Sequence, residues 1–320
     1  WDYTPAYIYL LKLATIPLPD HPLRAVKTLA LLFDAVLACG AYLLVRSRYP
    51  HSRLAAFAGA AVVLFSPTVV LNGALWAQSD AAYTSLLLLT LFAVLRHQHV
   101  WAFVLFGIAV SFKLPAMFLA PLLGVVYLRR RFSVAYFLIV PLTYSVIALP
   151  AVLSGMSFRS ALSVYSGQFD FYRKLSYSAP TVYQWIPNQY YEMFVGFGTA
   201  LALAAGLGLA TLAVVSERRL TSGILVRLAL ALMLAVPYVT PKMQDRYFFP
   251  ADVLSVIYAF YVPRRFYVPI MVTLCSLFSY QEFLFNQTPV PMTYVSLAML
   301  VPVAIVVHDY ASALFASPAA

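Results

Sequence analysis

Charged side chains interrupt the apolar sequence at residues 241–250, where Lys242, Asp245 and Arg246 lie within five positions. A charge inside a membrane costs about 2.5–3.5 kcal/mol, so such groups usually face a wet cavity or a partner and mark a functional site. The forked guanidinium of Arg246 suits phosphate oxygens, with Asp245 holding it in place and Tyr247 lining the lipid or sugar side. The alternative is an ion-pair cluster at the membrane surface.

Lys113 is a second isolated charge, between two apolar segments of about 14 residues. Each segment spans about 21 Å as a helix, against a hydrocarbon core of about 30 Å. The tip of such a hairpin does not reach the outer surface, so we expect Lys113 to lie recessed in an outward-facing cavity. A compact ammonium group there interacts strongly with phosphate. The alternative is a lysine that extends to the interface.

The stretch 72–80 joins two apolar runs and contains Trp76, Gln78 and Asp80. In a functional interpretation Trp76 and Gln78 orient a sugar, while Asp80 fixes the loop or binds substrate. In the alternative, Ser79 or Asp80 caps the next helix and Trp76 lies in the aromatic belt of the membrane interface.

The composition places these residues in a membrane protein. Apolar residues make up 63% of the 320-residue chain and charged residues 10%, which is too little polar surface for a soluble globule. The apolar runs are continuous rather than alternating, which favours helices over a barrel. We therefore expect an all-α integral membrane protein.

We expect a single transmembrane domain over residues 1–320, with about 11 spanning helices. An interfacial helix is expected within 1–25 on the outer face, where the apolar patch 6–16 is too short to span. The stretch 154–192 is expected to be a long outer loop, rich in aromatic and amide side chains that suit either sugars or the interface. Spans are predicted at 26–45, 54–71, 81–95, 99–112, 115–128, 133–153, 193–215, 224–240, 248–262, 266–284 and 290–308.

The basic residues indicate which ends of the spans are cytoplasmic. Arginine clusters fall in alternate loops, and the positive-inside rule makes those loops cytoplasmic. Most carboxylates and the polar segments described above then lie on the extracytoplasmic face, where we expect the site. These arginines account for the net charge of +10, and we expect no nucleic-acid partner. The clusters are Arg46, Arg48 and Arg53; Arg96; Arg129 to Arg131; Arg218 and Arg219; and Arg264 and Arg265.

The ordered set of polar segments resembles the GT-C polytopic membrane glycosyltransferases. The likeness covers essentially the whole chain. It is greatest to bacterial relatives of the mannosyltransferase that adds the second mannose of GPI anchors, with some similarity to dolichyl-phosphate-glucose-dependent glucosyltransferases. The matching motifs are Asp2-Tyr3-Thr4-Pro5, Trp76-Ala77-Gln78-Ser79-Asp80, Phe112-Lys113 and Gln244-Asp245-Arg246-Tyr247.

The resemblance implies transfer of a mannose-like hexose from a polyprenyl-phosphate donor to a lipid or glycan acceptor, with inversion, on the outer face of a bacterial plasma (inner) membrane. Such transfer needs a carboxylate base and cations for the phosphate leaving group. No cofactor is implied beyond the lipid-phosphate sugar, and the lack of an Asp-x-Asp pair predicts no dedicated metal site. The implied roles are catalytic for Asp2 and Asp80, near the acceptor; donor-phosphate binding for Lys113, Lys242, Arg246 and Tyr247; and sugar or acceptor binding for Trp76, Gln78, Gln244 and Asp245.

The sequence departs from the family pattern at several positions. Thr4 replaces the first proline of a Pro-Pro pair, Ala77 replaces a glycine, and Gln244-Asp245 replaces His-Glu. The family's catalytic aspartate lies upstream of the Asp-Tyr-Pro motif. We therefore expect a first helix and outer loop to precede Trp1, and Asp2 is the best carboxylate base within this sequence.

Two other functions use the same recessed cations. A transporter or flippase of an anionic lipid-linked substrate needs access from both faces, whereas the polar groups gather on one face and no inverted repeat is visible. A non-catalytic scaffold subunit is the other alternative.

Overall fold

The fold was analysed in a computed structural model that describes residues 4–165 and 173–315. Most of the described chain is helical, in agreement with the predicted all-α fold class. The chain divides into two compact units. The first unit contains residues 4–44, 53–117 and 133–165, and the second contains residues 45–52, 118–132 and 173–315. The prediction of one transmembrane domain remains a prediction.

The first unit begins with α1 (Pro5–Thr15), which falls inside the region predicted to hold a short helix. Its interfacial position remains a prediction, and residues 22–25 already belong to the next helix. Both α1 and α2 start with proline, which fits the first turn because its missing N–H has no partner there. The other helices of this unit are α2 (Pro22–Arg48, to Leu44), α3 (Arg53–Leu64), α4 (Pro67–Val70), α5 (Asp80–Leu95), α6 (His99–Phe112), α8 (Ile139–Leu153) and α9 (Phe158–Leu162).

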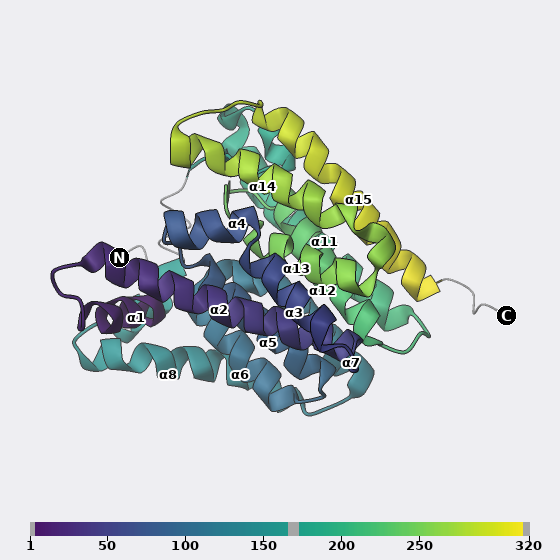
Figure 1. The fold of residues 1–320 in the computed structure, drawn as a ribbon, viewed down its shortest axis with the longest axis horizontal. Helices are drawn as coiled ribbons and strands as arrows, with labels where there is room; N and C mark the ends of the chain where they lie inside the picture. Colours follow the sequence, from purple (N-terminus) through teal and green to yellow (C-terminus); the bar gives the residue numbers. More distant parts are fainter. Residues whose placement is uncertain (1–3, 166–172, 316–320) are drawn as a thin grey trace. The chain divides into compact units, whose positions relative to one another are not determined.

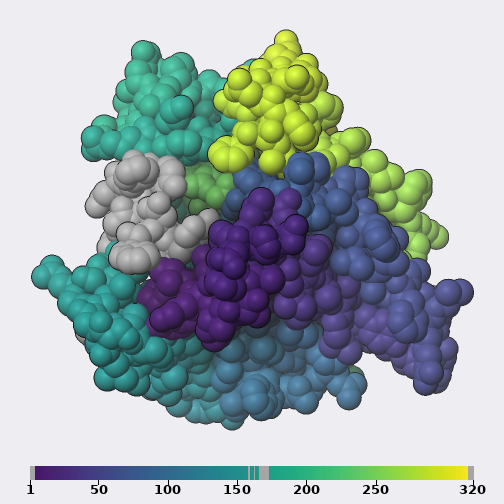
Figure 2. Space-filling view, turned by 60° about the vertical axis from the view of Figure 1, so that its left-hand side comes forward, coloured from purple at the N-terminus to yellow at the C-terminus, as the bar shows by residue number. Residues whose placement is uncertain are grey.

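Within this unit α6 packs between α5 and α8, as Figure 1 shows. Helix α1 lies against α8, and its dark purple surface borders the teal surface of α8 in Figure 2. The backbone N–H of Ala151 donates to the Tyr9 hydroxyl at 2.7 Å, which joins the two helices. Only 6% of the apolar segment Val134–Leu153, formed by the 3-10 turn η3 (Val134–Leu138) and α8, is buried, as expected for a surface in contact with lipid.

The predicted span 54–71 is broken. Helix α3 ends at Leu64, and α4 starts at Pro67, whose ring cannot continue a helix from the preceding residues. A π-helical turn, η1 (Leu71–Leu75), then follows α4 directly. The two halves are bent by 49°. The break brings the polar residue Asn72 into the interior of the unit, where it is fully buried.

The second unit contains α7 (Ala120–Arg130), α11 (Tyr191–Val215), α12 (Ser222–Val239), α13 (Phe249–Tyr261), α14 (Tyr267–Phe285) and α15 (Met292–Phe315). Helix α12 is its centre, in contact with α7, α11, α13 and α15, and most of its side chains are buried (Figure 1). The predicted span 115–128 is not one α-helix. It consists of a 3-10 segment, η2 (Leu114–Leu119), followed by α7.

The stretch predicted as a long loop contains regular structure. Besides α9 it holds β1 (Ser176–Tyr177) and two 3-10 turns, η4 (Val182–Trp185) and η5 (Asn188–Tyr190). Strand β1 pairs in parallel with β2 (Met243–Gln244), with Ser176 opposite Met243. Hydropathy gives no signal for such short strands.

Six helices of the described chain are long and apolar enough to cross a membrane, and the bent segment 53–75 makes a seventh if it counts as one span. They are α2, Val134–Leu153, Asn188–Val215, α12, Pro263–Phe285 and α15. Helices α5, α6 and α13, at 16, 14 and 13 residues, coincide with predicted spans but are shorter than a usual transmembrane helix. The protein is therefore a multi-pass helical membrane protein by length and composition, and a count of 11 is not confirmed.

Candidate functional site

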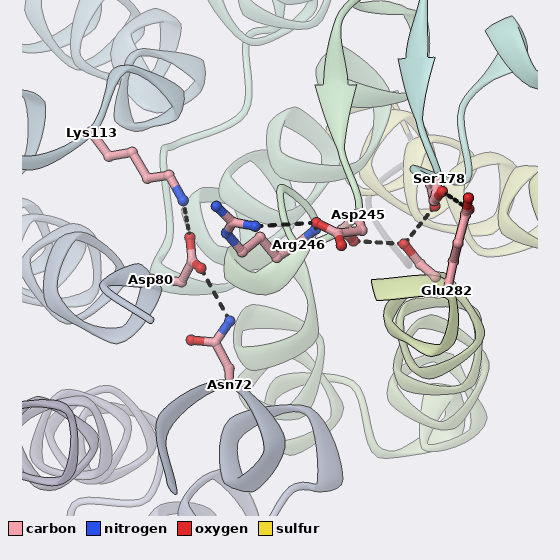
Figure 3. Close-up of polar contacts among 8 residues, drawn as sticks. Asn72, Asp80, Lys113, Ser178, Asp245, Arg246 and Glu282 are labelled. Atoms are coloured by element: carbon pink, nitrogen blue, oxygen red, sulfur yellow. Dashed lines mark hydrogen bonds and ion pairs between the residues drawn. The ribbon is translucent and has the colours of Figure 1, made fainter. Parts of the chain in front are cut away.

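The first unit contains a buried chain of three polar side chains, Asn72, Asp80 and Lys113 (Figure 3). The Lys113 ammonium lies 2.5 Å from Oδ1 of Asp80. The Asn72 amide donates through Nδ2 to Oδ2 of the same carboxylate at 3.1 Å. The Asp80 carboxylate is completely buried, whereas 16% of the Lys113 side chain is exposed. Lys113 is thus the member of the chain that extends toward the surface.

Three elements position these side chains. Asn72 is the second residue of η1, Asp80 is the first residue of α5, and Lys113 directly follows the last residue of α6. Helix α6 stops there because Lys113 adopts an extended backbone conformation, with φ −157° and ψ 134°. Its Nζ also lies 5.7 Å from the centre of the Tyr83 ring, one turn into α5. Helices α5 and α6 pack together, which brings Asp80 and Lys113 into contact.

The π-helical turn η1 is held from its other side by Asp34 of α2. A Cβ atom at Gly73 would lie 2.1 Å from Oδ2 of Asp34, so any larger residue would displace this carboxylate. Asp34 is 3% exposed, and its Oδ1 and the Oδ1 of Asn72 make no hydrogen bond within the described residues. Asp34 lies within the apolar sequence of α2, and its carboxylate packs against η1.

The turn between η1 and α5 holds the other residues predicted from this motif. Trp76 and Gln78 are half-buried, and the Gln78 N–H donates to the Asn72 carbonyl at 2.9 Å. Ala77 has φ 56°, in the left-handed region that favours glycine. The capping alternative is wrong for Ser79, because its side chain makes no cap hydrogen bond to α5. Asp80 instead contacts Lys113, a residue 33 positions away.

The second unit contains the segment 241–250, and its backbone is fixed by the small sheet. Lys242 has φ 63°, and its N–H donates to the Leu175 carbonyl at 2.8 Å just before β1. Its ammonium lies 5.1 Å from the centre of the Tyr191 ring at the start of α11. A cation over an aromatic face is stabilised by the ring quadrupole. Lys242 is half-buried in this position.

Asp245 and Arg246 form a looser ion pair than the one in the first unit. Nη1 of Arg246 lies 3.4 Å from Oδ1 of Asp245, and that oxygen also accepts the backbone N–H of Arg246 at 2.9 Å. The contact agrees with the expectation that Asp245 holds Arg246. The Arg246 side chain is 18% exposed. Gln244, in β2, and Tyr247 are both half-buried.

A serine pair ties this segment to α14 (Figure 3). The Ser279 hydroxyl lies 2.7 Å from the carbonyl oxygens of both Ser178 and Asp245. The Ser178 hydroxyl donates to the Glu282 carboxylate, one turn further along α14. The backbone of Asp245 is thus fixed by a helix that begins 22 residues later.

Sequence reasoning singled out Asp80 and Lys113 but did not pair them, and it missed Asn72, Ser178 and Ser279 as members of these clusters. The signal for Asn72 was a single amide in an apolar run directly before a polar turn. Asp2 lies outside the described residues. Among the described residues no three His, Cys, Asp or Glu side chains gather at one point. The lack of a metal site remains a prediction.

The sequence was also compared with known proteins. No protein-family model matches the chain. No curated protein matches it either.

Proposed function

We propose that this protein is a membrane glycosyltransferase of the GT-C type. It transfers a mannose-like hexose from a polyprenyl-phosphate donor to a lipid or glycan acceptor, on the extracytoplasmic face of the plasma (inner) membrane. The observation that carries the proposal is the position of Lys113, a partly exposed cation at the end of a 14-residue apolar helix and paired with a fully buried carboxylate.

The chemistry requires a cation at the phosphate that leaves with the lipid. Fixed positive charges stabilise the charge that develops on a leaving group, most strongly where water is excluded. In the first unit Lys113 fits this role, because its ammonium is partly exposed and is held 2.5 Å from the buried carboxylate of Asp80. In the second unit Arg246 fits it by its forked guanidinium, with Lys242 and Tyr247 nearby in sequence.

The contacts of Asp80 support a positioning role better than a catalytic one. Both of its oxygens accept hydrogen bonds, and the carboxylate is completely buried. A general base has to lie within hydrogen-bond reach of the proton that it removes. We therefore assign the base to Asp2 and the positioning of Lys113 to Asp80.

The conformation of Ala77 supports the resemblance on which the proposal also rests. The resembled family has glycine at this position of the Trp-x-Gln-x-Asp motif. A positive φ is the reason why a turn selects glycine, and Ala77 has φ 56°. Trp76 and Gln78 on either side of it remain the proposed sugar contacts in the first unit, and Gln244 and Asp245 in the second.

The test is sugar transfer by the purified protein. Polyprenyl-phosphate-linked mannose, glucose and arabinose are offered with a membrane-extract acceptor, to wild type and to Lys113→Met, Arg246→Ala and Asp2→Asn. Loss of about 10²-fold or more in turnover in each variant is expected, because each removes a group that acts in the transition state.

Two exposed residues provide matched controls. Lys12→Met removes an exposed lysine of α1, and Arg173→Ala removes an arginine whose ion pair with Glu192 is open to solvent. Both should keep wild-type turnover. If the wild-type protein moves the lipid-linked sugar across the membrane of proteoliposomes but does not transfer the sugar to an acceptor, it is a flippase. That result would contradict the proposed transferase.

A further inference from the structure

We propose that Asn72 is a positioning residue for the phosphate-binding Lys113, acting through the buried carboxylate of Asp80. The inference rests on the proposed contact between Lys113 and the donor phosphate. It adds to that function a residue from the π-helical turn.

The contacts form one continuous chain inside the first unit. The Asn72 amide fixes Oδ2 of Asp80, and Oδ1 of Asp80 in turn holds the Lys113 ammonium. A carboxylate at the start of a helix has several side-chain rotamers, and a hydrogen bond to its second oxygen selects one of them. Asp80 is 0% exposed, so bulk water does not reach this carboxylate in the folded protein.

The backbone around Asn72 is built to keep the amide in place. A π-helical turn is rare and marks functional positions in many helices, because its extra residue changes the direction of the side chains. The turn is fixed by the close packing of Asp34 on Gly73, the residue that follows Asn72. Asn72 itself is completely buried.

An amide is the side chain that this position requires. A leucine of similar volume removes the hydrogen bond that the Asn72 amide donates to Oδ2 of Asp80, which costs about 1–3 kcal/mol for a buried polar group. An aspartate has the same shape but places two carboxylates in contact. At low pH the two carboxylates share one proton, and the shared proton restores the missing hydrogen bond.

This difference gives a pH signature that a purely structural role does not produce. Of the charged and titratable groups around this position, Asp80 of α5 contacts residue 72 directly. Lys113 contacts Asp80, Tyr83 of α5 lies against Lys113, and Asp34 of α2 packs on the neighbouring Gly73. With Asn72→Asp, the hydrogen bond is present at low pH, where the pair holds its shared proton, and is lost as pH rises. With Asn72→Leu it is absent at every pH.

The experiment measures equilibrium binding of a short-chain polyprenyl phosphate by purified protein in detergent, between about pH 5.5 and pH 9. Each variant is compared with wild type at the same pH, because the phosphate itself also titrates. We expect Asn72→Asp to bind within about threefold of wild type at pH 5.5 and about tenfold or more weaker at pH 9. Asn72→Leu should be about tenfold weaker throughout. Gln98→Glu, an amide-to-acid change at an exposed position before α6, should match wild type.

The outcomes separate this inference from the proposed transferase. Two results would overturn the role of Asn72 and leave the proposed transferase unaffected. One is that Asn72→Leu binds polyprenyl phosphate as tightly as wild type. The other is that the affinity of Asn72→Asp relative to wild type does not change with pH. The expected pH signature in a protein without sugar transfer would support Asn72 and reject the transferase. Failure of the wild type to bind polyprenyl phosphate would overturn the inference.

Discussion

The two polar clusters hold their cations in different ways. In the first unit the Lys113 ammonium lies 2.5 Å from a completely buried carboxylate, which comes from a helix 33 residues earlier. In the second unit Arg246 lies 3.4 Å from the carboxylate of its own neighbour, Asp245. The first pair depends on the packing of two helices, whereas the second depends on the local backbone.

The supports of the two clusters differ accordingly. Asp80 is held by a side chain, the Asn72 amide, whereas Asp245 is held by its backbone carbonyl through Ser279. Coupling between side chains is strong where both are buried, because the interior has a low effective dielectric constant. We infer that the first cluster responds to single substitutions as a unit and that the second tolerates them.

The largest expected effect separates the two pairs directly. Lys113→Met removes the ammonium that lies 2.5 Å from the completely buried Asp80 carboxylate and should lower the free energy of unfolding by about 3 kcal/mol. The double variant Lys113→Met/Asp80→Asn should recover most of that loss. Asp245→Asn keeps an acceptor for the Arg246 N–H and should cost only about 1 kcal/mol. Denaturant unfolding in detergent measures all three, and equal losses for the two pairs would contradict the comparison.

A smaller effect is expected from two glycines that pack against polar side chains. Gly73→Ala places a methyl group against the Asp34 carboxylate, and Gly198→Ala places one 1.9 Å from the Tyr183 hydroxyl, which donates to the Val239 carbonyl. Burial raises the pKa of Tyr183 above its usual value, so this donor stays protonated in the neutral range. Each change should cost about 1–3 kcal/mol, since the interior must rearrange.

The functional outcome of these glycine variants should differ. Gly73→Ala should also weaken polyprenyl-phosphate binding, because it shifts the turn that carries Asn72. Gly198→Ala should leave that binding unchanged. If both variants have the same free energy of unfolding and both lose polyprenyl-phosphate binding, then binding does not depend on the first unit more than on the second.

The smallest effect concerns the two turns with a left-handed residue. Ala77→Gly should stabilise the protein by about 0.5–1 kcal/mol, because glycine adopts a positive φ without steric cost. Lys242→Gly should give no such gain, since it also removes the contact of the ammonium with the Tyr191 ring. Thermal unfolding of the purified variants tests both, and a gain for Lys242→Gly would show that the ring contact contributes little.

Hydropathy located the helices well, because apolar runs reflect local burial or contact with lipid. The predicted spans at 99–112 and 224–240 differ from α6 and α12 by two residues or fewer at either end. Hydropathy did not reveal the 49° break at Ser66 and Pro67, since both halves are apolar. Nor did it reveal η1, because a π-helical turn has no composition of its own.

The candidate residues were recognisable as isolated polar groups, but their partners were not. A single charge in an apolar run is visible in the sequence, as Lys113 and Asp80 were. Which charges meet depends on how helices rotate and pack, and nothing near either residue in the sequence contains that information. The same holds for Ser178, Ser279 and Glu282, which come together from segments about 100 residues apart.

The parallel pairing of β1 with β2 has a consequence for biosynthesis. Ser176 can meet Met243 only after α11 and α12, which lie between them in the chain, have been synthesised and the segment after α12 has reached the same side of the membrane. Strand β1 therefore remains without its partner strand while two membrane helices are inserted. The second cluster is assembled late, whereas the contacts among Asn72, Asp80 and Lys113 can form once Lys113 has been synthesised.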